Sequence, residues 1–585
     1  MFTKEKILSF LPFVETIKNY SKGKFNGDLV AGLTVAIVAI PQSMAYAMIA
    51  GVDPRLGLYA TIAPVIVSSL FGSSNFLIAG PTNAIAMVVF SSISTTVIGK
   101  DLIINLDNEQ KIGAIFLLAF LVGLIQFVMG AAKLGNLVNF ISHSVVVGFT
   151  AGAGILIAFN QLKNFLGLKF TSHPEFIHTF EDTFRHIGDT NKIALYLGLF
   201  TVAFILIGKR ISKKIPGALL SMISAAILVA IFNLDGAVYK LELVGTIPQS
   251  LPPLSIMPFS FDMIRALFMP ALAIAVLGSV EALSIAKSIA SKSREKIDGS
   301  QEFIAQGLAN IAAGFFSGIP GSGSFTRSAV NYDSGAKTRF AGVYSAIFIL
   351  ATILAFAPLA RFIPKTSLAA ILMIIAYNMI DRKEIISIWK TTKSDAAVMT
   401  VTMLSTLLLE LEKAVFVGVL LSIALFLRKV SRPQIKQVCP RESDNRMAEM
   451  HLVDKKCPQI SIYQIDGPLF FGAINDLCNQ LCDINVDGVH VVIVRMRGVH
   501  LVDATGIHAL EMFMRDMKGK NTKVIFTNVT PEVLKVLKSS GVLDKIGADH
   551  IQPDTTASIK FACDRYVVKA ECANCQQKIF RECIQ

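Results

Sequence analysis

Long apolar blocks dominate the first three quarters of this 585-residue chain. The blocks at 29–49 and 114–132, for example, are long enough as helices to cross ~30 Å of hydrocarbon. The hydrophobic pattern therefore predicts an α-helical polytopic membrane protein. We expect fourteen segments, at residues 29–49, 55–71, 82–98, 112–132, 144–161, 193–208, 215–232, 264–286, 302–317, 324–332, 340–360, 366–380, 395–411 and 414–429.

Charged residues are scarce and collect in the predicted loops. They make up 17% of the chain, against about 25% in soluble domains. Lys and Arg outnumber Asp and Glu by 55 to 42, a net charge of +13. Basic clusters at 209–214, 287–296 and 382–390 fall on the same side as the basic N-terminal segment, which predicts a cell (inner) membrane protein with both termini cytoplasmic. No basic patch carries interleaved aromatic residues, so we expect no nucleic-acid partner.

Two of the segments are unlike plain spanning helices. One begins at Gly-Pro-Thr-Asn (80–83), and the other follows Ile-Pro-Gly-Ser-Gly-Ser (319–324). Shifting the chain by 239 residues lays 36–42 on 275–281 and brings these interruptions close to register. Seven segments in each half would invert the second half relative to the first. Interrupted segments at matching places in two halves are typical of the binding site of a secondary transporter.

The hydrophobic pattern of the sequence changes after residue 430. Strand-like runs at 460–465, 489–494 and 523–528 alternate with helix-like runs at 474–482, 506–518 and 531–539, which predicts a small cytoplasmic α/β domain. We therefore divide the chain into an N-terminal cytoplasmic segment 1–28, a transmembrane transport domain 29–429, a linker 430–458, an α/β domain 459–560 and a Cys-rich tail 561–585.

The two interrupted segments predict an anion site. A helix start has unpaired N–H groups and the positive end of the helix dipole, so it can hold an anion without a full charge. Pro81 suits a first helical turn, and Thr82 and Ser324 can either cap their helices or donate a hydroxyl to a ligand. The alternative is that these are Gly/Pro kinks in ordinary helices.

Three further polar residues lie at membrane depth. Arg327, just inside the second short helix, would strengthen the positive field, or it pairs with a structural carboxylate or reaches an aqueous vestibule. Glu281 lies within an apolar stretch and is a candidate H⁺ carrier or Na⁺ ligand, or a fixed partner of Arg327. Gln42, at the equivalent place in the first half, could donate to an anion or bond between helices.

The C-terminal region has two weaker candidate sites. Thr505 follows a predicted strand and opens a helix, so it could accept a phosphate, although a simple helix cap explains it more readily. Four cysteines could hold zinc, but their irregular spacing favours free thiols. No G-x4-G-K-[ST] sequence is present, so we expect neither ATP-driven pumping nor a cofactor. The cysteines are Cys563, Cys572, Cys575 and Cys583.

Several motifs closely resemble the SulP (sulfate permease) anion-transporter family. Those of the membrane part lie at 31–34, 40–47, 57–59, 80–82, 142–150 and 326–338, and those at 466–471 and 503–506 resemble its C-terminal STAS domain. The resemblance implies a 7+7 inverted repeat of core and gate bundles, an elevator-like movement and a homodimer. It also implies that the central site is lined by Gln42, Thr82, Glu281, Ser324 and Arg327. Phe325 and Thr326, next to Ser324, are further candidate substrate-binding residues. Thr505 matches a position where related bacterial antagonists carry a phosphorylatable Ser.

Members of that family move sulfate, bicarbonate, chloride or dicarboxylates. The expected function is therefore secondary active transport of an inorganic anion, coupled to H⁺ or Na⁺, and not an enzymatic reaction. Arg327 favours a divalent anion, hence sulfate before bicarbonate. The bilayer and a cytosolic protein that binds the STAS domain are the other expected partners. Two alternatives are a nucleobase permease of the same fold and a membrane-anchored regulatory scaffold.

Overall fold

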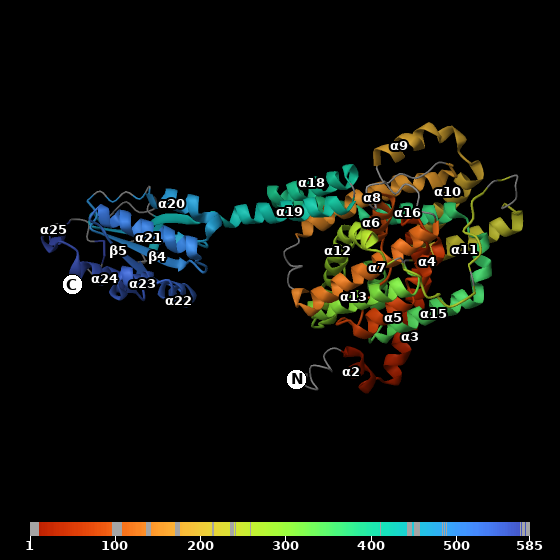
Figure 1. Ribbon diagram of the computed structural model, residues 1–585, viewed down its shortest axis with the longest axis horizontal. Helices are drawn as coiled ribbons and strands as arrows, with labels where there is room; N and C mark the ends of the chain where they lie inside the picture. Colours follow the sequence, from red (N-terminus) through yellow and green to blue (C-terminus); the bar gives the residue numbers. More distant parts are fainter. Residues whose placement is uncertain are drawn as a thin grey trace. The chain divides into compact units, whose positions relative to one another are not determined.

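The chain divides into two compact units, Met1–Ser422 and Ile423–Gln585 (Figure 1). The computed structural model describes residues 11–95, 108–135, 142–169, 176–212, 216–234, 239, 241–247, 249–257, 259–409, 411–440, 447–449, 457–482, 484, 486, 488–573, 575 and 579–580. The sequence predictions also cover residues outside this part of the chain, at 1–10, 96–98, 213–215, 410, 441–446, 450–456, 483, 485, 487, 574, 576–578 and 581–585, with Cys583 among them.

Each of the predicted membrane segments coincides with a helix, or with two consecutive helices. Over the described residues, seven helices are long and apolar enough to cross a membrane, by length and composition. The inverted repeat stays a prediction. The helices are α3 (Lys22–Ile49), α4 (Pro54–Tyr59), α5 (Ala63–Phe71), α6 (Asn83–Thr95), α7 (Asn108–Ala131), α8 (His143–Leu166), α10 (Lys192–Ile211), α11 (Gly217–Phe232), α12 (Phe261–Ser293), α13 (Gly299–Phe315), α14 (Phe325–Asp333), α15 (Phe340–Phe356), α16 (Lys365–Met379), α18 (Lys393–Leu408) and α19 (Leu411–Val430).

Other short helices lie outside the predicted segments. They are α2 (Pro12–Lys18), α9 (Phe176–Arg185) and α17 (Arg382–Thr391), together with the 3₁₀ turn η2 (Ile187–Asp189). A further 3₁₀ turn, η3 (Ala357–Phe362), follows α15 and forms the end of the predicted segment 340–360. The helix α17 begins after Asp381, whose carboxylate accepts from the backbone N–H groups of Lys383 and Glu384. The basic cluster 382–390 therefore lies on a capped helix and not in an irregular loop.

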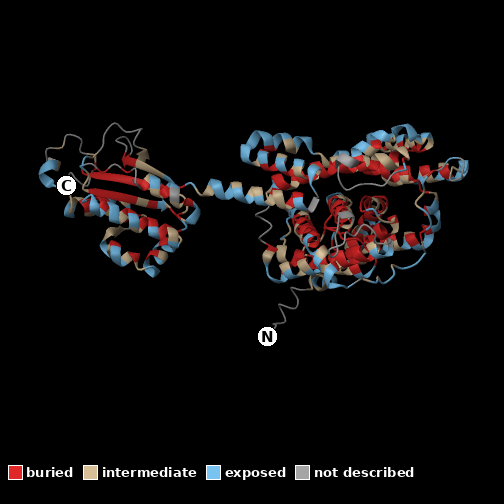
Figure 2. Cartoon of the chain, turned by 45° about the horizontal axis from the view of Figure 1, so that its top comes forward, coloured by how far each residue is buried: buried red, intermediate tan, exposed pale blue. Residues whose placement is uncertain are grey.

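Small residues let the membrane helices pack backbone against backbone. A Cβ on Gly123 of α7 would lie 2.5 Å from the carbonyl oxygen of Gly307 in α13, and one on Gly148 of α8 would lie 2.3 Å from that of Met399 in α18. Only glycine permits these approaches, which is the usual way in which membrane helices gain contact without a hydrophobic driving force. The buried residues gather in the interior of this unit, with exposed positions outside (Figure 2).

The second unit is built on a six-stranded sheet of order β2-β1-β3-β4-β5-β6. From β3 to β6 neighbouring strands are parallel, and Ile462, Ile493 and Ile525 are in register across three of them. The strands are β1 (Gln434–Pro440), β2 (Met447–Glu449), β3 (Ile460–Asp466), β4 (Val491–Gly498), β5 (Lys523–Thr527) and β6 (Ile551–Gln552). The helices are α20 (Ile474–Cys482), α21 (Ala504–Gly519), α22 (Pro531–Ser539), α23 (Val542–Ile546), α24 (Thr555–Arg565) and α25 (Lys569–Ala573).

The predicted linker 430–458 is wrong in part, because β1 and β2 belong to the sheet. β1 pairs antiparallel with β3, and Val438 is buried in the same apolar cluster as Ile462. Of the first four residues of β1, Gln434, Lys436 and Gln437 are polar, and none of the four is buried, so the sequence lacks the apolar run that marks a buried strand. The predicted boundary at 560 also falls inside α24, and Phe580, within the predicted tail, is buried in that cluster.

Candidate anion site

The two interrupted segments meet inside the membrane unit. Residues 72–82 and 317–324 have no helical structure and lead directly into α6 and α14. The backbone N–H of Ser322 donates to Gly80 O at 2.9 Å, and that of Ser324 donates to Ile78 O at 2.9 Å. From Ser322 to Ser324 the chain moves forward by two residues, while the bonded partner moves back by two, from Gly80 to Ile78. The two stretches therefore run antiparallel. The starts of α6 and α14 are therefore held close together.

The hydroxyl groups at both helix starts act as caps. Ser324 Oγ accepts from the backbone N–H of Arg327 at 3.5 Å. Thr82 Oγ1 accepts from the N–H of Ile85 at 3.5 Å and donates to Glu281 Oε2 at 3.3 Å. Such caps satisfy only part of the first turn, whose other N–H groups have no partner within the helix. Capping and ligand binding are therefore compatible roles for these side chains.

Arg327 is a fully buried cation aimed at the other helix start. Its Nη2 donates to the carbonyl oxygen of Pro81 at 2.6 Å, just before α6. Its Nε and Nη1 have no hydrogen-bond partner among the described residues. The guanidinium lies against Gly80, which has φ +125° and where a Cβ would come within 2.8 Å of Nη1. Glycine is required there for both its backbone conformation and its lack of a side chain.

Two further candidate polar side chains come from α12 and α3. Glu281 is partly accessible and contacts Thr82. It makes no hydrogen bond to Arg327. This conformation therefore does not show Glu281 as a fixed partner of Arg327. Gln42 is buried, and its Oε1 lacks a partner within the described part of the chain. Tyr46, one turn after Gln42, is buried within electrostatic reach of Arg327 and Glu281.

Phe325 and Thr326 are accessible, unlike the guanidinium that follows them. The Phe325 side chain is 59% exposed and Thr326 is exposed, whereas Arg327, the next residue, is fully buried. The first turn of α14 therefore carries two accessible side chains and a buried cation. The structure brings Thr82, Glu281, Ser324 and Arg327 together with the helix starts, and Phe325 and Thr326 flank that group.

A buried amide network, which the sequence analysis missed, holds the stretch before α14. Asn310 of α13 donates to Gly321 O at 3.0 Å and accepts from Gly321 N at 2.8 Å. It also donates to Gln126 Oε1 at 2.8 Å, and Gln126 of α7 donates to Ala275 O in α12 at 3.3 Å. The sequence could have indicated this network, because two apolar helices each contain an uncharged polar residue at membrane depth. Burying such a residue is costly unless it has a hydrogen-bond partner.

Two side chains of α14 and one of α13 hold the other stretch. Ser328 Oγ accepts from Ile78 N at 2.9 Å, and Asn331 Nδ2 donates to Phe76 O at 3.1 Å. Glu302 of α13 is buried and accepts from both the N–H and the hydroxyl of Ser73 at 3.0 Å. The irregular backbone at both helix starts is thus paired with protein groups, as it must be at membrane depth.

Thr505 lies at the start of α21 in the second unit, but it is not the helix cap. Asp503 caps the helix, because its Oδ1 accepts from the N–H groups of Thr505 and Gly506, both at 2.9 Å. Its Oδ2 accepts from Phe471 N at 2.9 Å and so joins the helix to the 3₁₀ turn Phe471–Ala473. The capping interpretation of Thr505 is therefore wrong, and its side chain is partly exposed. Over the described residues, no group of His, Cys, Asp or Glu is arranged to hold a metal ion.

Comparison with known sequences decides the family. Residues 25–402 match the Sulfate permease family, and residues 451–557 match the STAS domain. The chain belongs to the sulfate permease family. It is 32% identical over 539 residues to "Putative sulfate transporter YvdB" of Bacillus subtilis (strain 168), with 92% of this chain and 98% of that protein covered. It is 30% identical over 564 residues to "Sulfate transporter 4.1, chloroplastic" of Arabidopsis thaliana, with 92% and 81% covered.

Solved structures agree on the fold. Murine Slc26a9, an anion transporter, superposes with a TM-score of 0.89 at 21% identity over 96% of this chain and 95% of that one. The transmembrane domain of the cyanobacterial bicarbonate transporter BicA superposes with a TM-score of 0.59 at 26% identity over 69% of this chain and 98% of that one. The resemblance to SulP is confirmed, and this sulfate permease family member is a multi-pass membrane protein with a STAS domain.

Proposed function

We propose that this chain is a secondary active transporter that binds an inorganic anion between the starts of α6 and α14. The observation that carries the proposal is the buried Arg327 guanidinium, which has two nitrogens without a partner and lies beside both helix starts. A buried cation is costly unless its donors are satisfied, and a bound anion would satisfy one of them. The two helix dipoles would add to the same positive field.

Sulfate is the favoured anion and bicarbonate is second. A divalent tetrahedral anion can accept from one of the unpartnered nitrogens of Arg327 and from N–H groups of both helix starts at once. The names of the relatives YvdB and sulfate transporter 4.1 support sulfate, and the similarity to BicA supports bicarbonate. In this proposal Gln42 of α3 contributes its amide, and Phe325 and Thr326 flank the open side of the site.

Glu281 would couple transport to H⁺ or Na⁺. Its carboxylate contacts Thr82 at the start of α6, is partly accessible and has no hydrogen bond to Arg327. Protonation or Na⁺ binding at Glu281 would therefore change the charge beside the anion without breaking an ion pair. We further propose elevator-type alternating access by a homodimer in the cell membrane, with both termini cytoplasmic.

The test is uptake by the full chain in proteoliposomes. Labelled sulfate and labelled bicarbonate are each supplied with and without Na⁺ and at two pH values, with protein-free vesicles as the control. We expect saturable uptake of sulfate that depends on pH or on Na⁺. If only bicarbonate is taken up in a saturable manner, bicarbonate replaces sulfate as the proposed substrate, and the proposed anion transport stands. If neither anion is taken up in a saturable manner, the proposal is wrong.

The STAS domain would regulate this transport. Thr505 is partly exposed beside the capped start of α21, where the helix dipole would stabilise a phosphate. Deletion of residues 430–585 separates this view from a scaffold: a transporter should keep some uptake if the membrane unit still folds. Thr505→Glu should change the uptake rate of the full chain, whereas Thr505→Ala should leave the basal rate near that of wild type.

A further inference from the structure

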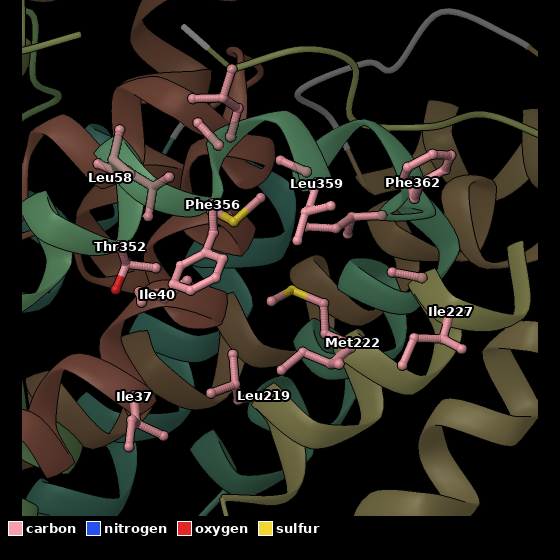
Figure 3. Close-up of a pocket in the computed structure, with 18 of the residues that line it drawn as sticks. Ile37, Ile40, Leu58, Leu219, Met222, Ile227, Thr352, Phe356, Leu359 and Phe362 are labelled. Atoms are coloured by element: carbon pink, nitrogen blue, oxygen red, sulfur yellow. The ribbon is translucent and has the colours of Figure 1, made fainter. Parts of the chain in front are cut away.

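A cavity of about 560 Å³ lies in the membrane unit among α3, α11, α15 and η3. Figure 3 shows side chains from these elements converging on it. Its volume falls within the range of ~300–1,000 Å³ that is usual for ligand pockets. Representative lining residues are Ile37 and Ile40 of α3, Met222 and Ala226 of α11, Ile353 of α15 and Phe362 of η3.

The chemistry of the lining excludes a polar ligand. The side chains that line the cavity are hydrocarbon or thioether, apart from the hydroxyl of Thr352. That hydroxyl already donates to Phe348 O one turn earlier in α15, at 2.8 Å. An anion placed here would lose its hydration and gain no charged partner from the lining. The cavity is therefore chemically distinct from the proposed anion site, and it fits a hydrocarbon chain.

Exposed apolar side chains form the rim of the cavity. Ile223 and Ile227 of α11, Phe356 at the end of α15 and Leu359 of η3 line the cavity and are also exposed. In a bilayer, exposed apolar side chains on the outside of membrane helices would contact acyl chains, and these are then the hydrocarbon that adjoins this rim. A lipid could enter sideways without crossing a polar barrier.

A cation stands at the η3 end of the cavity. Arg361 is exposed, and its Cζ lies 4.7 Å from the ring centroid of Phe362, which lines the cavity. An Arg beside an apolar membrane pocket complements a lipid phosphate. We propose that this cavity binds one acyl chain of an anionic phospholipid, whose phosphate is held by Arg361. The bound chain would separate α11 from α3, the helix that carries Gln42.

The test is photolabelling of the full chain in phosphatidylcholine vesicles that contain increasing fractions of phosphatidylglycerol with a diazirine in one acyl chain. Peptide mass spectrometry then compares labelling of 217–232 and 357–362 with labelling of 192–211 in α10. We expect saturable labelling of the first two segments, displaced more effectively by unlabelled phosphatidylglycerol than by phosphatidylcholine. Ala226→Phe, which fills the cavity, should lower it to the level of α10. Ala203→Phe, at an exposed position of α10, is the matched control and should match wild type.

Each outcome decides a part of the proposal. Labelling of wild type that rises linearly and equally on all three segments would overturn the site, and this result does not depend on whether Ala226→Phe folds. Labelling of a folded Ala226→Phe variant at the wild-type level would also overturn it. Arg361→Gln should remove the preference for phosphatidylglycerol, and an unchanged preference would refute the phosphate contact. Anion uptake is not the readout, so failure here is separable from failure of the proposed function.

Discussion

Replacing Arg327 by Ala tests the charge at the centre of the anion site. The variant removes a fully buried guanidinium whose Nη2 is bonded to Pro81 O and whose Nε and Nη1 have no partner in the described structure. These two donors lie on different edges of the guanidinium, so a single anion accepts from one of them, and its affinity depends directly on that bond. Arg327→Lys keeps the positive charge but replaces the planar group by an ammonium.

The magnitude follows from the loss of one charged hydrogen bond. Such a bond contributes about 1.5–3 kcal/mol, so its loss costs at least about 1.5 kcal/mol. Since ~1.4 kcal/mol corresponds to a factor of ten in Kd, Arg327→Ala should weaken anion binding by at least about tenfold. Arg327→Lys keeps the charge and a donor, so it should weaken binding less than Arg327→Ala does.

The assay is calorimetric titration of detergent-solubilised protein with sulfate and with bicarbonate, beside the KM of uptake in vesicles. The matched control is Ser328→Ala, which removes the bond to Ile78 N in the same stretch but no charge. We expect the Kd of this control to stay within about threefold of wild type, less than the loss of one charged hydrogen bond. An Arg327→Ala protein that elutes as wild type does and binds both anions with unchanged Kd would refute the reasoning.

Three further predictions concern other parts of the molecule. Glu281→Gln should abolish the dependence of uptake on pH or Na⁺ while anion binding persists, and a retained dependence would place coupling elsewhere. Asn310→Ala leaves the backbone N–H of Gly321 without its partner. A buried unsatisfied group costs about 1–3 kcal/mol, so this variant should have a lower Tm than wild type in detergent. A Tm equal to that of wild type would contradict this. Burial lowers the pKa of His550 below its ordinary value of 6.5, so the folded STAS domain favours the neutral ring. Stability should therefore be full above pH 6.5 and fall as the pH drops through the folded pKa. Hydrogen exchange over 547–566, corrected for intrinsic rates, should be faster at pH 5 than at pH 7 in wild type, and His550→Gln should reduce the difference.

Local chemistry alone was enough to predict most of the elements. Each predicted membrane segment coincides with helical structure, because apolar runs of that length have no other stable form in hydrocarbon. In the STAS domain, α20 and α22 begin and end where their sequence patterns indicated. The strand β1 was missed because its early residues are polar, and only its pairing with β3 makes it a strand.

The sequence by itself determined that this protein spans a membrane, that two of its helices start at membrane depth, and which polar residues are available near those starts. It could not determine that Gly80 and Ser322 share a backbone hydrogen bond, or that Arg327 reaches across to Pro81. Nor did it indicate which buried amides hold the two stretches. Those contacts join residues that are far apart in the chain, and only the packing of helices around them fixes the distances on which hydrogen bonds and anion binding depend.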